Sequence, residues 1–127
     1  MNQSAAFQHF GLRARITAAA QVVELPRILP HHRGGTTVHS VNGAVVAMMC
    51  DAALGLTLIA TGLPVPPGSG VARLDIRMKK PIEGDSARAI ARITAVRRNL
   101  VYAGITVEDE RGIVCVVATG TVYRGRR

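Results

Sequence analysis

The segment from Gly43 to Ala60, GAVVAMMCDAALGLTLIA, constrains the fold most, because Asp51 is its only charged residue. A helix that is apolar on every side has to be buried. Asn42 is placed to cap the start of this helix, and Gly62 follows its end. A membrane span is the main competing interpretation. An ionised Asp near the middle of a span would be costly, so we expect a buried core helix and no membrane association.

Alternating apolar and polar residues predict strands on both sides of this helix. The chain order is one strand, the helix and four strands, and short connections make the last strands antiparallel. One helix can cover one face of such a sheet, and Ala-rich inner positions suit a sheet that curves tightly around it. We therefore expect an α+β fold with a curved antiparallel sheet of five to six strands around one apolar helix. The expected strands span residues 13–25, 71–79, 86–96, 100–108 and 113–123, the last of them in the interior of the sheet.

The length of 127 residues predicts one domain, residues 1–127, with an N-terminal segment at 1–12 and a core at 13–124. Residues 1–12 suit a poorly ordered start or a short helix. They lack the pattern of a signal peptide. Cys50 and Cys115 lie in apolar stretches without metal-ligand spacing, which is typical of reduced thiols. We expect a cytoplasmic protein.

Sixteen Lys and Arg against eight Asp and Glu give a formal charge of +8, which favours anionic partners. Nucleic acid, an anionic membrane and a phosphorylated small molecule all qualify. Two Phe, two Tyr and no Trp leave few stacking platforms for bases. No helix-turn-helix or RNP pattern occurs. We expect no nucleic-acid partner, and a basic nucleic-acid-binding domain remains a second alternative function.

The stretch from Asn42 to Asp51, NGAVVAMMCD, resembles the PaaI-type motif of hotdog-fold thioesterases. That motif runs His-Gly-Gly, then apolar residues, then Asp nine positions after the His. The stretches RMKKP at 77–81 and DERGIVCVVATGT at 109–121 resemble the family's basic strand end and closing hairpin, so the resemblance spans roughly residues 11–124. It departs at three positions: Asn42 replaces the His, Ala44 the second Gly, and Ala72 a common Ser or Thr.

This resemblance implies a hotdog fold and an acyl-CoA thioesterase that acts as a homodimer with shared sites. A dimer of dimers, and thus a homotetramer, is common among relatives. His39 lies three positions before Asn42 and could replace the motif His only if its loop were rearranged.

Thioester hydrolysis needs a base or nucleophile and donors for the developing oxyanion. Asp51 suits the first role, either by activating water or by direct attack. The expected burial would make it a stronger base. The backbone N–H of Gly43 is the natural oxyanion donor because it has no partner inside the helix. The Asn42 amide could donate a second hydrogen bond. Two alternatives remain: a structural carboxylate at Asp51 and a simple N-cap at Asn42.

Gly43 and Asp51 are eight positions apart, or roughly 12 Å along a helix that rises ~1.5 Å per residue. They are too far apart to grip one thioester from one chain. Two such helices packed antiparallel about a two-fold axis would bring Asp51 of one chain toward Gly43 of the other. The spacing therefore also predicts a site shared across a homodimer.

The phosphates of CoA call for basic residues, and two pairs are candidates. These are Lys79-Lys80 and Arg97-Arg98, with His39 as a further residue near the substrate. We expect no metal, because His31 and His32 have no nearby acid, and no cofactor beyond CoA as part of the substrate. The acyl group, a small aryl or acyl chain, is not fixed by the sequence. A non-catalytic acyl-CoA or acyl-ligand binding protein of the same fold is the first alternative function.

Overall fold

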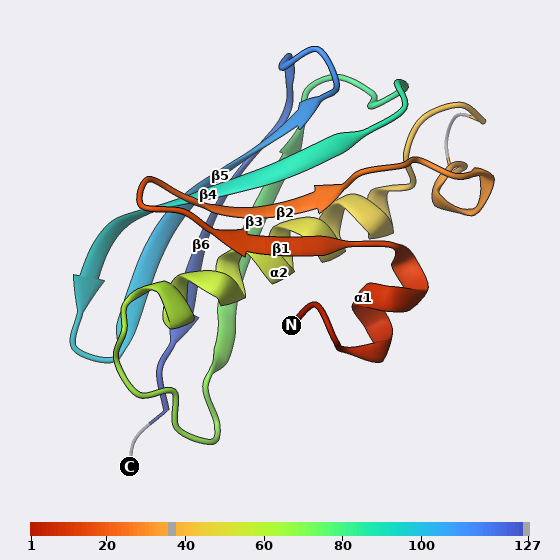
Figure 1. Ribbon diagram of the computed structural model, residues 1–127. Coiled ribbons are helices and arrows are strands. Elements are labelled where there is room, and N and C mark those ends of the chain that lie inside the picture. The colour runs from red at the N-terminus through yellow and green to blue at the C-terminus, as the bar shows by residue number, and fades with distance from the viewer. Residues whose placement is uncertain (36–37, 126–127) are drawn as a thin grey trace.

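The computed structural model describes residues 1–35 and 38–125. It contains one six-stranded antiparallel sheet and a long helix that lies against one face of the sheet (Figure 1). The strand order is β1-β2-β4-β5-β6-β3. This arrangement confirms the expected α+β hotdog fold, including the interior position of the last strand. In chain order the elements are α1 (Ala5–Phe10), β1 (Arg13–Ile16), β2 (Gln21–Leu25), a 3-10 turn (Pro30–His32), α2 (Gly43–Ala60), β3 (Gly70–Met78), β4 (Ala87–Arg97), β5 (Leu100–Asp109) and β6 (Val114–Tyr123).

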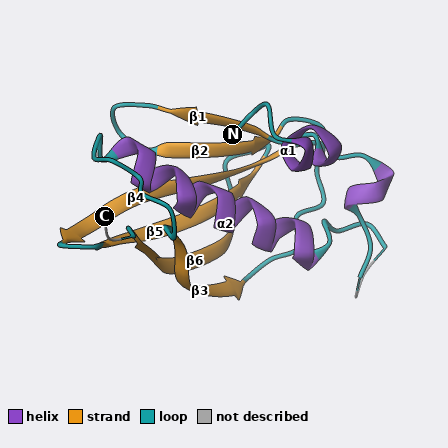
Figure 2. Ribbon diagram, turned by 90° about the horizontal axis from the view of Figure 1, so that it is seen from below, coloured by secondary structure: helices purple, strands orange, loops and turns teal. Residues whose placement is uncertain are grey.

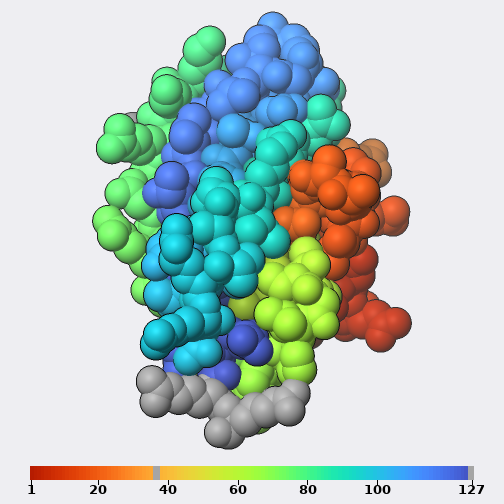
Figure 3. Space-filling model, turned by 90° about the vertical axis from the view of Figure 1, so that its left-hand side faces the viewer, coloured from red at the N-terminus to blue at the C-terminus, as the bar shows by residue number. Residues whose placement is uncertain are grey.

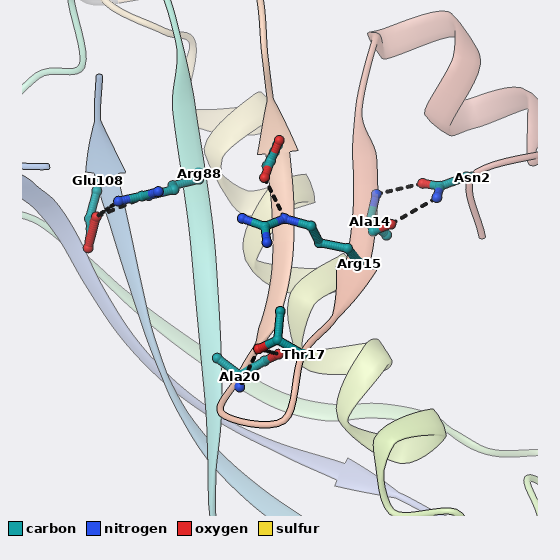
Figure 4. Close-up of polar contacts among 8 residues, drawn as sticks. Asn2, Ala14, Arg15, Thr17, Ala20, Arg88 and Glu108 are labelled. Atoms are coloured by element: carbon teal, nitrogen blue, oxygen red, sulfur yellow. Dashed lines mark hydrogen bonds and ion pairs between the residues drawn. The ribbon is translucent and has the colours of Figure 1, made fainter. Parts of the chain in front are cut away.

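The prediction of one long strand over 13–25 is wrong, because the chain reverses in its middle to form the β1–β2 hairpin. Thr17 makes the turn: its hydroxyl donates to the Ala20 carbonyl at 2.9 Å and accepts from the Ala20 N–H at 3.0 Å (Figure 4). The turn contains no Gly, Pro, Asn or Asp, the residues that usually mark turns in a sequence. The alternating pattern therefore runs through it unbroken.

The N-terminal segment forms the short helix α1, one of its two expected states. The Ser4 hydroxyl accepts a hydrogen bond from the Phe7 N–H and caps this helix. Phe7 is buried in the main core, so the segment is anchored by an aromatic side chain.

Helix α2 crosses the concave face of the sheet obliquely (Figure 2). Its N-terminus lies near the end of β3 and its C-terminus near the β1–β2 turn. Small residues line the sheet beneath it, and a Cβ on Gly120 would meet Leu54 Cδ2 at 2.3 Å. The helix therefore rests closer to the strands than larger side chains would allow. The buried small residues of the inner face include Ala89, Ala91, Ala103 and Ala118.

The expectation that α2 is buried on every side is wrong for the single chain. One stripe of the helix is exposed or only half-buried because the sheet covers one side of it; it comprises Ala44, Met48, Asp51, Gly55 and Ile59. Helix α2 is the one helix in the described residues long and apolar enough to cross a membrane, and 56% of it is buried inside the protein. The core helix of a soluble protein has the same length and composition.

The two edges of the sheet differ. At the β1 edge the Asn2 side chain pairs with the backbone of Ala14, donating to its carbonyl at 2.8 Å and accepting from its N–H (Figure 4). Asn2 thus occupies the Ala14 groups through which this part of β1 could pair with another strand. At the other edge, β3 is hydrogen-bonded to β6 alone. The free side of β3 is therefore the open edge of the sheet.

We predict that Gly120→Ala destabilises the protein by about 1–3 kcal/mol, as overpacking does. The new Cβ would lie 2.9 Å from the Arg73 carbonyl oxygen as well as against Leu54, and backbone on that side cannot move away easily. Gly104→Ala, on the neighbouring strand, is the matched control because its Cβ would meet no atom within 4 Å. Urea unfolding of both variants measures the difference. Equal stability of the two variants would contradict the close packing of α2.

Candidate functional site

The first turn of α2 presents an unpaired backbone donor. The Asn42 side-chain oxygen accepts the Ala44 N–H at 2.8 Å, and the Asn42 carbonyl accepts the N–H groups of Val45 and Val46. Asn42 is thus the N-cap, as expected. Its side-chain NH₂ takes no part in the cap. The N–H of Gly43 has no acceptor among the described residues, and Gly43 is exposed.

A cavity of about 370 Å³ opens at this end of the helix. Gly43 and Val46 form the helix side of it, and the end of β3 forms the opposite wall. Met78 Cε lies 3.8 Å from where a Gly43 Cβ would be, so the Met78 side chain borders the cavity next to Gly43. The remaining lining residues are Gly34, Ser40, Val41, Lys79, Lys80, Pro81, Ile82 and Val116.

Lys79 and Lys80 are the two expected phosphate-binding residues that lie at this cavity. Their backbone N–H groups both donate to the Cys115 carbonyl, at 2.9 and 3.0 Å. This contact fixes the backbone beyond β3 while both lysines stay exposed. The cavity therefore combines an apolar wall, a helix N-terminus and two lysines, which favours an anionic ligand with an apolar part.

Asp51 lies two turns further along α2, on its exposed stripe. No described group donates a hydrogen bond to its carboxylate or pairs with it. This contradicts the alternative of a buried structural carboxylate held by a Thr or a backbone amide. It also contradicts the expected burial, since the single chain leaves Asp51 exposed. Asp51 does not line the cavity at Gly43, as its spacing in the sequence required.

The other candidate residues, His39, Arg97 and Arg98, do not line this cavity. The His39 side chain is exposed and is not among the lining residues. Arg97 and Arg98 occupy the β4–β5 turn at the far end of α2 (Figure 1). Cys50 and Cys115 are buried free thiols. Burial, with a smaller contribution from Asp51, raises the pKa of Cys50 to about 12, so Cys50 is a poor nucleophile at neutral pH.

His32 is a residue whose place the sequence did not reveal, because a His-His pair in a loop suggests solvated side chains. It is buried and bonded at both ring nitrogens: Nδ1 accepts from the Leu29 N–H at 2.9 Å, and Nε2 donates to the Phe10 carbonyl at 2.7 Å. The His32 carbonyl accepts the Asn42 N–H at 2.8 Å. His32 therefore ties α1 and the loop to the residue that caps α2.

Arg33 is a second positioning residue that the sequence analysis missed. Its guanidinium donates to the carbonyls of His39, Glu83 and Gly84. It thereby joins the loop before α2 to the loop after β3, the two segments that flank the cavity. An Arg beside Gly34-Gly35 gives no sequence signal for such backbone contacts.

No group of three His, Cys, Asp or Glu in residues 1–35 and 38–125 could hold a metal ion. The expectations about metal and cofactors remain predictions.

Comparison with known proteins gives a family match and many similar folds. The thioesterase superfamily model matches residues 39–116, more than half of the chain. No curated protein matches. The PaaI protein of E. coli, described as from the phenylacetic acid degradation operon, is 16% identical with a TM-score of 0.83, over 98% of this chain and 87% of that chain.

Two further solved structures are also similar. The BH2602 protein of Bacillus halodurans, solved with CoA, is 22% identical with a TM-score of 0.82, over 98% of this chain and 80% of its own. Thioesterase HI1161 of Haemophilus influenzae is 18% identical with a TM-score of 0.75, over 96% of this chain and 83% of its own. At these identities the likeness concerns the fold.

We predict that His32 makes stability fall with acidity. Burial is the main cause that lowers the pKa of His32 below its ordinary value of 6.5, and His31 and Arg33 lower it further. Below about pH 6.5 the unfolded chain binds a proton that the folded chain resists, so this contribution is present above that pH and is lost as pH falls toward the folded-state pKa. Urea midpoints between pH 7.5 and 5.5 should fall less in His32→Gln than in the wild type.

The His32→Gln substitution should also lower the free energy of unfolding by about 1–3 kcal/mol at pH 7.5, because one buried hydrogen-bond partner of the ring is left unpaired. His39→Gln is the control and should keep the wild-type pH dependence, since that ring is exposed. Parallel pH curves for wild type and His32→Gln would refute this role of His32.

Proposed function

The chain belongs to the thioesterase superfamily, and we propose that it hydrolyses an acyl-CoA thioester to the free acid and CoA. The observation that carries this proposal is the unpaired N–H of Gly43, a residue at the N-terminus of α2 that lines a cavity together with Lys79 and Lys80. A thioester carbonyl in this cavity would meet a positioned donor, the helix dipole and no side chain at residue 43. These features stabilise a developing oxyanion.

Asp51 is the acid we assign to the attack on the thioester carbonyl. Its carboxylate is unpaired and accessible, so it is free either to deprotonate a water or to attack the carbonyl carbon itself. Both routes need the carboxylate within reach of the carbon held by a Gly43 N–H. Within one chain the two groups are about two helical turns apart.

We therefore propose that the working unit is a homodimer in which each site combines Gly43 of one chain with Asp51 of the other. Two features support this assembly. The β3 edge is open whereas Asn2 occupies part of the β1 edge, and the exposed stripe of α2 carries apolar side chains beside Asp51. Pairing of two β3 strands about a two-fold axis would set two α2 helices antiparallel on one continuous sheet. Covering the stripe would then place Asp51 in an apolar setting. A homotetramer and a cytoplasmic location remain predictions.

The cavity favours a small acyl group. Val41, Ile82 and Val116 form an apolar wall, and about 370 Å³ suits an aryl ring or a short chain. Met78 borders this space and is half exposed, so its flexible side chain limits the size of the acyl group. Lys79 and Lys80 would face the polar part of the ligand.

A non-catalytic acyl-CoA binding protein is the second candidate function. Two replacements favour it: Asn42 stands where the family motif has a His, and Ala72 where relatives often have a hydroxyl. Ala72 is the extra residue of a bulge in β3, between Val71 and Arg73, and it is exposed. Its methyl group cannot orient water by a hydrogen bond.

Asp51→Asn distinguishes these two functions. We expect kcat for short acyl-CoA and aryl-CoA substrates to fall by about 10²–10⁴-fold, because the base or nucleophile is lost. CoA binding should persist, and stability should change by no more than about 0.5 kcal/mol, because the carboxylate is exposed and unpaired. Asp85→Asn, at an exposed loop carboxylate, should keep full activity. Release of CoA thiol at the uncatalysed rate by wild type and variant alike would eliminate the enzyme hypothesis.

Gly43→Pro tests the backbone donor. Gly43 is the first residue of α2, where Pro is well tolerated because the missing N–H has no helical partner. The preceding Asn42 has φ −59° and ψ 138°, the extended conformation that a following Pro requires. We expect normal folding and a loss of about 10²–10³-fold in kcat. Gly43→Ala retains the N–H, and its Cβ makes ordinary contact with Met78, so it should lose far less.

Mixing the two inactive variants tests whether the site is shared. After refolding an equal mixture of Asp51→Asn and Gly43→Pro chains, half of the dimers contain one chain of each kind. Each mixed dimer has one intact site, made from Gly43 of the first chain and Asp51 of the second, so about a quarter of wild-type activity should return. No recovery in a mixture that forms dimers would show that the site lies within one chain.

A further inference from the structure

Gly55 is a glycine in the interior of α2 that packing within the chain does not require. It lies about one turn after Asp51 on the exposed stripe of the helix. Glycine in a helix interior is less favourable than alanine. A Cβ at Gly55 would meet one atom of the described residues within 4 Å, Met1 Cε at 3.9 Å, which is an ordinary van der Waals contact. The glycine therefore keeps a space open beside Asp51 for which the packing of the single chain gives no reason.

Met1 bounds this space, and hydrogen bonds fix its backbone. The Asn2 side chain makes two hydrogen bonds with the backbone of Ala14 in β1. The Met1 carbonyl accepts the Ser4 N–H at 3.0 Å, and the Ser4 hydroxyl in turn caps α1. The Met1 side chain is 45% exposed. Met1 is thus held beside Gly55 by its neighbours in the sequence, while its side chain keeps room to move.

The N-terminal segment and the second half of α2 meet at the surface of the protein. Figure 2 shows the N-terminus on the β1 side of α2. Figure 3 shows the lime-green end of α2 at the surface, with red N-terminal residues beside it. The flanking side chains of the stripe are apolar: Met48 is half-buried and Ile59 is 51% exposed. A flexible thioether opposite a glycine, with apolar side chains on either side, suits a hydrocarbon group.

We propose that Met1, positioned by Asn2, closes the acyl-binding space beside Asp51 and sets the longest acyl chain that the protein accepts. This inference rests on the proposed function, in which Asp51 of one chain acts on a thioester held at Gly43 of the other. Gly55 is four residues beyond Asp51, or about 6 Å along the helix. An acyl group that extends from the carbonyl along this stripe therefore meets Met1 after roughly one helical turn. That length accommodates an aryl ring or a short chain.

The antiparallel helices of the proposed homodimer determine which walls meet around the acyl group. With Asp51 of one chain beside Gly43 of the other, Met1 of the first chain lies beyond the start of the second helix, toward the loop that precedes it. That loop contributes Ser40 to the cavity at Gly43, and Met78 borders the same cavity. The acyl group then lies between Met78 of one chain and Met1 of the other, and each side chain limits it from a different side.

Asn2→Ala tests this role because it releases Met1 from its place. The substitution removes both hydrogen bonds to Ala14, so the Met1 side chain is no longer held at Gly55. We expect the ratio of kcat/KM for decanoyl-CoA to that for butanoyl-CoA to rise at least about 10-fold, because each further buried methylene contributes about fourfold. Met1→Ala should raise the ratio in the same way. A removable tag supplies the start codon for that variant, and wild type with the same leftover residues is its reference.

Gly55→Leu fills the same space and should shift the ratio the other way, lowering it at least about 10-fold. Gln3→Ala is the matched control, because Gln3 is an exposed neighbour of Asn2, and it should keep the wild-type ratio. Thermal unfolding identifies the variants that are folded. A general loss of structure lowers the rates for both substrates together, whereas a changed wall changes their ratio. An unchanged ratio in folded Asn2→Ala, Met1→Ala and Gly55→Leu proteins overturns the inference.

Calorimetry with the non-hydrolysable thioethers S-butyl-CoA and S-decyl-CoA separates this inference from the proposed function. If no thioester is hydrolysed but Asn2→Ala gains affinity for S-decyl-CoA over S-butyl-CoA, the proposed function fails and the role of Met1 stands. If hydrolysis is normal and every variant keeps the wild-type chain-length preference, the function stands and the inference is overturned. If Gly55→Leu weakens the dimer in sedimentation without changing that preference, Gly55 serves helix contact alone and the inference is likewise overturned.

Discussion

Close contact between α2 and the concave face of the sheet determines the position of every candidate residue. The contact depends on small inner residues, since Gly120 lies under Leu54 with no room for a Cβ and Ala89 and Ala91 are fully buried. Interlocked packing at this distance prevents α2 from sliding along its axis and from rotating about it. Gly43 is therefore fixed beside the end of β3, and Asp51 is fixed on the side that faces away from the sheet.

The same packing leaves one side of α2 uncovered in the single chain. A sheet can cover only one side of α2, so a helix that is apolar all round keeps an exposed stripe with Asp51 within it. Isolated apolar residues on a surface are ordinary, whereas a continuous stripe beside an unpaired strand edge is typical of an interface. Asn2 occupies backbone groups at the β1 edge, and β3 has no such cover among the described residues. The partly occupied β1 edge and the open β3 edge together favour association through β3.

The sequence predicted what depends on local pattern and failed where the cause is long-range. Helix α2 was predicted with its observed bounds because an unbroken apolar run with an N-cap has few other interpretations, and four strands matched within one residue at each end. The β1–β2 turn was missed because Thr17 makes it with a hydroxyl instead of a turn residue. His32 and Arg33 were missed because their partners lie in distant segments, at Phe10 and at Glu83 and Gly84. The exposure of Asp51 depends on which side of α2 meets the sheet, and an all-apolar helix does not encode that choice.

The replacements at Asn42 and Ala72 weigh less on the chemistry than their place in the family motif suggests. The oxyanion donor that we propose is a backbone group, and its position depends on where α2 begins, not on which side chain stands at residue 42. Asn42 caps the helix through its oxygen and so keeps the Gly43 N–H at the first turn. The side-chain NH₂ group of Asn42 remains able to donate a hydrogen bond. A neutral His at this position would also donate, through its single ring N–H. The His32 carbonyl accepts the Asn42 N–H, and the Arg33 guanidinium joins the loop before α2 to the loop after β3, so the start of the helix is held by hydrogen bonds to backbone groups. A site built in this way tolerates side-chain replacement as long as the start of the helix and the carboxylate of Asp51 are preserved.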